Sequence, residues 1–150
     1  MTDVSRVGRR SIADIVLAAE TAAWLVLAGL ALRALSFARV AALAGGPPSS
    51  ARATQMDDNT ADRIGWAMEA AARRLPWRPL CFERGLAAHM MLRRRGQASM
   101  LHYGARSDGS LGPSAHVWVR LGARDVVGGE EAACFATLAT FPAGPADLDS

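Results

Sequence analysis

Two residues of this 150-residue chain have side chains suited to nucleophilic catalysis, Cys81 and His116. Cys81 follows a Pro-rich stretch and directly precedes residues 82–95, whose apolar spacing predicts a helix with one buried side. A thiol at a helix N-terminus meets unpaired N–H groups and the positive end of the helix dipole, which favour the nucleophilic thiolate. His116 begins an alternating run, residues 116–120, that predicts a half-buried strand. Such a strand could hold the imidazole against the helix end, as a thiol hydrolase requires.

Each of the two residues also has a purely structural interpretation. Free cysteine is among the residue types most often buried, and a single histidine at the start of a strand is commonly a polar residue with a satisfied hydrogen bond. Local motifs of thiol enzymes do not transfer between families. Spacing alone therefore leaves the function of the pair open.

The segments around Cys81 and His116 carry a family resemblance. Residues 79–96 have the sequence PLCFERGLAAHMMLRRRG, residues 101–104 are LHYG, and residues 115–119 are AHVWV. Together they resemble the leader peptidases of lasso-peptide biosynthesis, the protease half of the B-type maturation proteins, within the transglutaminase-like superfamily. The resemblance covers residues 75–142. The chain length and the apolar N-terminal third look like the stand-alone form of this protease.

The resemblance implies a fold and a reaction. The expected fold is α+β, a transglutaminase-like or papain-like cysteine protease core in which helices precede an antiparallel sheet, with an apolar helical region at the N-terminus. The expected reaction removes the leader from a precursor peptide: Cys81 attacks a carbonyl carbon, and His116 takes the thiol proton and protonates the leaving amine. A separate leader-recognition protein would present the precursor, and an asparagine-synthetase-like cyclase would then close the ring.

A third side chain normally orients the histidine of such a site. The resemblance implies an aspartate about a dozen residues after the histidine, but Gly128 and Gly129 occupy that place. Asp125 and Glu130 remain as candidates. If a three-residue loop follows residue 121, Glu130 lies opposite His116, whereas a two-residue loop puts Gly129 there. Asp125 is also close in sequence to the expected place, but a tight hairpin keeps it by the turn, where a salt bridge explains it equally well.

The N-terminal third is the most apolar part of the chain. Residues 16–32 are shorter than the ~20 residues of a spanning helix and include Glu20, a charge that costs about 2.5–3.5 kcal/mol near the middle of a span. We therefore expect a buried or interfacial helix, capped by Ser11 and Asp14 and ended by residues 45–48. Such a helix exposes more apolar surface than a small domain covers, so a partner protein or a membrane surface is expected to meet it.

A loop rich in Pro, Ser and Asp at residues 47–59 divides the chain. Residues 1–48 form the expected apolar helical region, and residues 49–150 the expected peptidase core. Within the core the patterns predict helices at residues 59–74 and 81–96, and strands at residues 98–103, 116–121 and 125–127.

Composition limits the cofactors, the partners and the location. The net charge of +3 comes largely from short arginine runs that are typical of solvated faces, so no nucleic-acid partner is expected. No paired metal-ligand spacing and no Gly-rich phosphate loop is present, so neither a metal nor a nucleotide cofactor is expected. Two cysteines without a secretory signal suit a reducing cytoplasm, with association to a membrane surface as the alternative location.

Two other functions fit the same residues. In a transglutaminase-like acyltransferase an amine, rather than water, would resolve the thioester, and the Cys/His pair does not distinguish the two reactions. A non-catalytic binding module on the same fold is favoured by the two glycines at the place of the third catalytic side chain.

Overall fold

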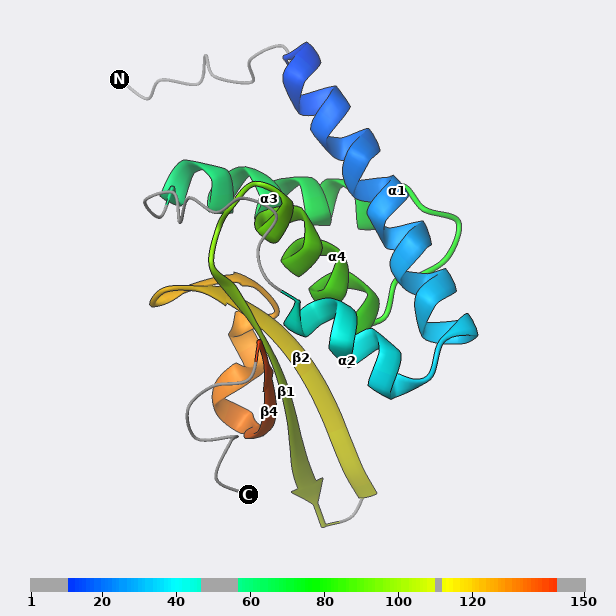
Figure 1. Ribbon diagram of the computed structural model, residues 1–150, viewed down its shortest axis with the longest axis vertical. Coiled ribbons are helices and arrows are strands. Elements are labelled where there is room, and N and C mark those ends of the chain that lie inside the picture. The colour runs from blue at the N-terminus through cyan, green and yellow to red at the C-terminus, as the bar shows by residue number, and fades with distance from the viewer. Residues whose placement is uncertain (1–10, 47–56, 110–111, 143–150) are drawn as a thin grey trace, which may run out of the picture.

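The computed structural model describes residues 11–46, 57–109 and 112–142. Within these ranges four α-helices precede an antiparallel sheet of four strands (Figure 1). The helices are α1 (Ile12–Ala34), α2 (Phe37–Gly45), α3 (Asp58–Ala72) and α4 (Cys81–Arg94). The strands are β1 (Ser99–Asp108), β2 (Gly112–Leu121), β3 (Arg124–Val127) and β4 (Ala136–Phe141), and the 3-10 helix η1 (Gly129–Cys134) precedes β4. The predicted α+β class and the order of helices before sheet are confirmed.

The helical layer is built around α4, which packs against α1 and α3 on one side and against the sheet on the other. The N-cap predicted for α1 is present: the Ser11 Oγ accepts from the backbone N–H of Ala13, and Asp14 accepts from that of Ser11, each at 3.2 Å. The largest buried side chains of the three helices form one core, including Leu25, Ile64, Met68, Met91 and Leu92. Residues 47–56 of the predicted loop lie outside the described residues, and its last residues belong to the start of α3, which begins at Asp58 with Asp57 as its N-cap.

The sheet has the strand order β3-β2-β1-β4. Strands β1 and β2 pair over ten residues each, and β2 begins four residues before His116, which therefore lies within the strand instead of opening it. Strand β4, which the sequence patterns did not predict, completes the sheet beside β1. The turn after β2 has two residues, because Leu121 pairs with Arg124 and Gly122 supplies the positive φ of 61° that such a turn needs.

The two faces of the sheet have different neighbours. Val117, Val119 and Leu121 of β2 belong to the core beneath the helices, whereas Trp118 packs with Ala132 and Phe135 near η1. In Figure 1, η1 (orange) lies on the far side of β1 and β2 from α2 and α4. Because successive side chains of a strand alternate between faces, β2 presents a helical face and an η1 face.

Candidate functional site

Cys81 is the first residue of α4, as predicted, and its thiol is exposed. The preceding backbone N–H, that of Leu80, donates to the Glu83 Oε2 at 3.0 Å, and the carboxyl group of Glu83 is almost completely buried. The side chain of Cys81 forms no hydrogen bond with the described residues. A thiol at the start of a helix, open to solvent and free of local partners, is available to react.

An open groove of about 610 Å³ lies beside Cys81. Its wall carries three arginines: Arg84 pairs with Glu69, while Arg73 and Arg78 form no ion pair with described residues. The Nε of Arg84 is buried and has no hydrogen-bond acceptor within the described ranges. The groove therefore has a net positive wall, and Trp77, 37% exposed, adds an aromatic surface to it.

The ring of His116 lies on the η1 face of the sheet. It stacks on Trp118 with centroids 6.0 Å apart and lies 5.0 Å from the Phe135 ring. Its neighbour Val117 points the other way, toward α4, where a Cβ built on Gly85 would come within 2.5 Å of the Val117 Cγ1. The structure thus places the imidazole and the Cys81 thiol on different faces and does not bring the two side chains together. Their assignment as a catalytic pair stays a prediction.

The tautomer of His116 is set by a backbone group. Its Nε2 lies 2.8 Å from the carbonyl oxygen of Gly128, and because a carbonyl only accepts, Nε2 is the donor. The neutral ring then keeps an unprotonated Nδ1, the nitrogen that can accept a proton. The Gly128 carbonyl therefore fixes the tautomer of His116 and holds its ring on the η1 face of the sheet.

Neither candidate acid is hydrogen-bonded to His116. Asp125 accepts from the Arg120 Nε at 2.6 Å across the β2–β3 pair, which is the salt bridge considered as its structural explanation. Glu130 is exposed in the first turn of η1, beyond the end of β3. The three-residue loop that would place Glu130 opposite His116 is wrong, because the turn has two residues and the chain leaves the strand at Gly128.

The backbone conformation of Gly128 explains why this position does not carry the aspartate that the family resemblance implies. Its φ is 75°, a left-handed conformation that side chains disfavour. A Cβ at this position would lie 2.6 Å from the carbonyl oxygen of Val117 and 3.3 Å from the Trp118 Cα. An aspartate cannot be accommodated here without moving β2, so a backbone carbonyl stands where a carboxylate was expected.

The other two histidines have structural environments. His89 is fully buried, its Nε2 lies 2.9 Å from the Ala44 carbonyl oxygen, and its Nδ1 lies 2.9 Å from the Ser99 Oγ. Burial lowers the pKa of His89 to about 4, so its ring is neutral at physiological pH. The ring of His102 stacks on Trp118 on the η1 face, with centroids 5.3 Å apart.

Sequence reasoning missed two features of this region, the Gly128 carbonyl and the arginine-lined wall. The pair of glycines after a short strand was visible as a departure from the family pattern, but a backbone acceptor has no residue type that would reveal it. Arg73 precedes the Pro-rich stretch before Cys81 and Arg78 lies within it, and these two arginines are the indication that could have located the wall.

Comparison with known proteins gives a family. Residues 24–140, more than half of the chain, match the family model of the Transglutaminase-like superfamily. The comparisons with curated proteins and with solved structures found no significant match. The family match confirms the predicted transglutaminase-like domain, and it begins inside α1.

Proposed function

The chain belongs to the transglutaminase-like superfamily, and on that premise we propose that it is a cysteine peptidase that removes the leader from a lasso-peptide precursor. The observation that carries the proposal is the position of Cys81, whose exposed thiol lies at the N-terminus of α4 in the wall of an open groove. The sequence resemblance supplies the substrate class, and a separate leader-recognition protein is the proposed partner that delivers it.

The proposed reaction uses the Cys81 thiol at the start of α4 and the His116 imidazole of β2. The Cys81 thiol gives its proton to the Nδ1 of His116, and the sulfur attacks the scissile carbonyl carbon. The C–N bond then breaks, the leaving amine takes the proton from His116, and the thioester forms. Water then cleaves the thioester and regenerates the thiol. The first N–H groups of α4 have no acceptor within the helix and are the donors available to the oxyanion. The positive groove wall favours precursors with an acidic residue near the cleaved bond.

The proposal requires His116 to reach the helical face when substrate or recognition protein is bound. Catalytic hydrogen bonds are often long or poorly aligned in free enzymes and tighten in the substrate complex. His116 is next to Val117, which contacts the same helix one turn after Cys81. Because residues 116 and 117 point to opposite faces of β2, this movement requires β2 to change its pairing with β1 around Gly104.

Mass spectrometry of a precursor peptide incubated with the protein and its recognition partner tests the proposal. We expect Cys81→Ala and His116→Ala to abolish leader release, while Cys134→Ala, which removes the other exposed thiol, retains it. Asp125→Ala and Glu130→Ala should keep most of the activity, because neither carboxylate contacts the imidazole. Leader release that persists in Cys81→Ala would rule out the thiol mechanism. Transfer of the acyl group to an added amine, in place of free leader, would identify an acyltransferase instead.

A non-catalytic binding module is the second candidate. The position of the His116 ring favours this function, because contacts with Gly128 and Phe135 hold the ring on the η1 face of the sheet, away from Cys81. A binding module predicts that wild type and Cys81→Ala bind the precursor equally and that neither releases the leader, with recognition partner and precursor both verified. Leader release by the wild type excludes it.

A further inference from the structure

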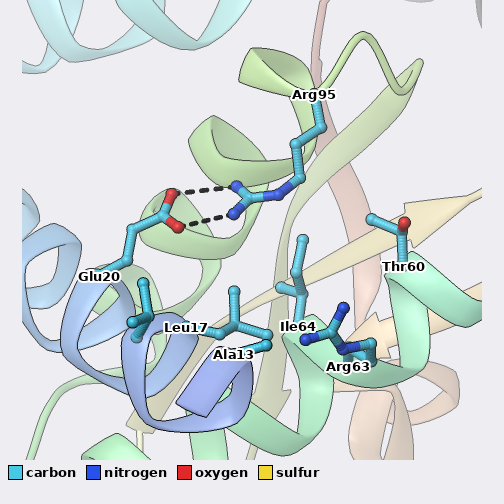
Figure 2. Close-up of a pocket in the computed structure, with 8 residues that line it drawn as sticks. Ala13, Leu17, Glu20, Thr60, Arg63, Ile64 and Arg95 are labelled. Carbon is cyan, nitrogen blue, oxygen red and sulfur yellow. Dashed lines mark hydrogen bonds and ion pairs between the residues drawn. The ribbon is translucent and has the colours of Figure 1, made fainter. Parts of the chain in front are cut away.

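The two acidic side chains of α1 form ion pairs with the rest of the protein. Glu20 forms a two-pronged ion pair with Arg95, at 2.6 and 3.0 Å, beside a cavity of about 220 Å³ between α1, α3 and the end of α4 (Figure 2). Asp14 lies 3.5 Å from Arg63 of α3, and the buried Thr21 donates its hydroxyl to the Leu17 carbonyl. These contacts fix the rotation of α1 with both of its acids on the inner side.

The outer side of α1 is an uninterrupted apolar surface, which we call the outer stripe. Every exposed position from Ile12 to Leu30 is apolar. Its large side chains are 40% to 80% exposed: Ile12, Ile15, Val16, Val26, Leu27 and Leu30. The 19 residues from Ile12 to Leu30 span about 28 Å of helix, so the stripe is a long, narrow surface without an exposed charge along its length.

The apolar surface continues from α1 toward α2. A shallow groove of about 290 Å³ joins α1, α2 and α4, and its lining includes Trp24, Leu27, Leu43 and Met90. Leu43 and Phe37 of α2 are both more than half exposed. The exposed apolar surface is therefore wider than one helix face.

The charges that face outward beside the outer stripe are positive. Among the described residues of α1 and α2 the charged ones are Asp14, Glu20, Arg33 and Arg39. The two acids pair with Arg63 and Arg95, and Arg39 is exposed. The side chain of Arg33 is 72% exposed and lies 4.0 Å from the Oε1 of the buried Glu83. An apolar face bordered by arginines is complementary to the interface of a membrane that carries anionic lipids.

The inward ion pairs also decide how the helix would meet a bilayer. The sequence of α1 is long and apolar enough to span a membrane. A spanning position would take Glu20 and Asp14 away from Arg95 and Arg63 and would remove buried residues such as Leu25 from the core. Burying the outer stripe alone keeps all of these contacts.

We propose that α1 lies flat on an anionic membrane surface, with the outer stripe among the acyl chains near the headgroups and with Arg33 and Arg39 at the lipid phosphates. The contacts that carry this proposal do not involve Cys81 or His116, so it is independent of the proposed peptidase activity.

Co-sedimentation of the full chain with lipid vesicles tests the proposal. We expect the protein to bind vesicles of phosphatidylcholine containing 30% phosphatidylserine, and to bind less as salt is raised. Ile15→Asp together with Leu30→Asp should weaken binding by about tenfold or more, because both place a charge among acyl chains. Leu138→Asp is the matched control, since Leu138 is 60% exposed on β4, outside α1 and α2, and this variant should bind as the wild type does. Arg39→Gln should lose about fivefold on anionic vesicles and little on neutral ones, because Arg39 is exposed and forms no ion pair with the described residues.

Three results would overturn the proposal. Wild-type protein that stays in the supernatant with anionic vesicles excludes a lipid surface as the occupant, and a dimer dissolved by Ile15→Asp in sedimentation velocity would then assign the stripe to a second copy. Equal loss of binding in Leu138→Asp and in the α1 variants would mean that the stripe is not the contact. If circular dichroism shows that an aspartate variant is unfolded, Ile15→Ser and Leu30→Ser repeat the comparison in folded protein, and unchanged binding by both would also overturn it.

Discussion

At the scale of single residues, both the backbone conformation of Gly128 and its close approach to β2 exclude a side chain at this position. Its positive φ costs a side chain about 1–2 kcal/mol, and a Cβ would in addition approach the Val117 carbonyl oxygen at 2.6 Å. We expect Gly128→Ala to lower the free energy of unfolding by about 2 kcal/mol or more, measured by urea denaturation.

Gly112 is the matched control for this substitution. Its φ is 80°, but a Cβ there would meet nothing within 4 Å. Gly112→Ala should therefore show the conformational cost alone, about 1 kcal/mol. Equal losses in the two variants would contradict the close approach of Gly128 to β2.

His89 gives the fold a dependence on pH. The pKa of its buried imidazole is lowered from 6.5 to about 4, mainly by desolvation, so between these values the unfolded chain binds more protons than the folded protein. The stabilisation from a neutral His89 is complete above pH 6.5 and is lost as the pH falls toward 4, by roughly 3 kcal/mol in all. Urea denaturation from pH 7.5 to 4 should show this decline. His89→Gln, which does not titrate, should show a flatter profile over the same range, and an identical slope would remove His89 as its cause.

At the scale of elements, α4 and β2 meet at Gly85. A Cβ at this position would lie 2.5 Å from the Val117 Cγ1 and 3.2 Å from the Leu101 Cδ1. Alanine is the better helix former by about 1 kcal/mol, yet we expect Gly85→Ala to destabilise the fold by about 1–3 kcal/mol, because α4 must move away from the sheet. Because α4 carries Cys81, leader release should fall in the same variant.

Gly45 at the end of α2 provides the comparison, since nothing lies within 4 Å of its Cβ position. Thermal unfolding should show Gly45→Ala as neutral or slightly stabilising. A Gly85→Ala variant that melts at or above the temperature of Gly45→Ala would contradict close packing of α4 on β2.

The elements that the sequence predicted are those whose determinants are local. The Ser11 cap, the start of α4 at Cys81 and the hairpin after β2 depend on residues a few positions apart. Strand β4 was missed because residues 136–140 are alanine, threonine and leucine with mostly exposed side chains, so no apolar alternation marks it. The face occupied by His116 was also beyond the sequence, because it depends on Val117 packing against Gly85, and alternation alone fixes no absolute direction.

At the scale of the whole molecule, α1 belongs to the same core as the predicted peptidase segment. Leu17, Leu25 and Ala28 of α1 are in the core cluster with Ile64, Met68 and Leu92, and the family match itself begins within α1. The division at residue 48 thus remains a prediction about folding units that truncation can test. A domain boundary at residue 48 predicts that residues 49–150 fold alone, whereas a core shared with α1 predicts that they do not.

We expect the fragment 49–150 to lack a cooperative thermal transition. Without α1, the faces of α3 and α4 that pack on it are exposed, and Arg63 and Arg95 lose their partners. Buried apolar side chains contribute about 1.5–3 kcal/mol each, so losing several of them is comparable with the 5–15 kcal/mol by which a domain of this size is stable. Circular dichroism melting of residues 49–150 beside residues 11–150, which keep α1, measures the difference. A cooperative transition in the shorter fragment, at the temperature of the longer one, would instead make α1 an appended element whose inner ion pairs add little to the stability of the core.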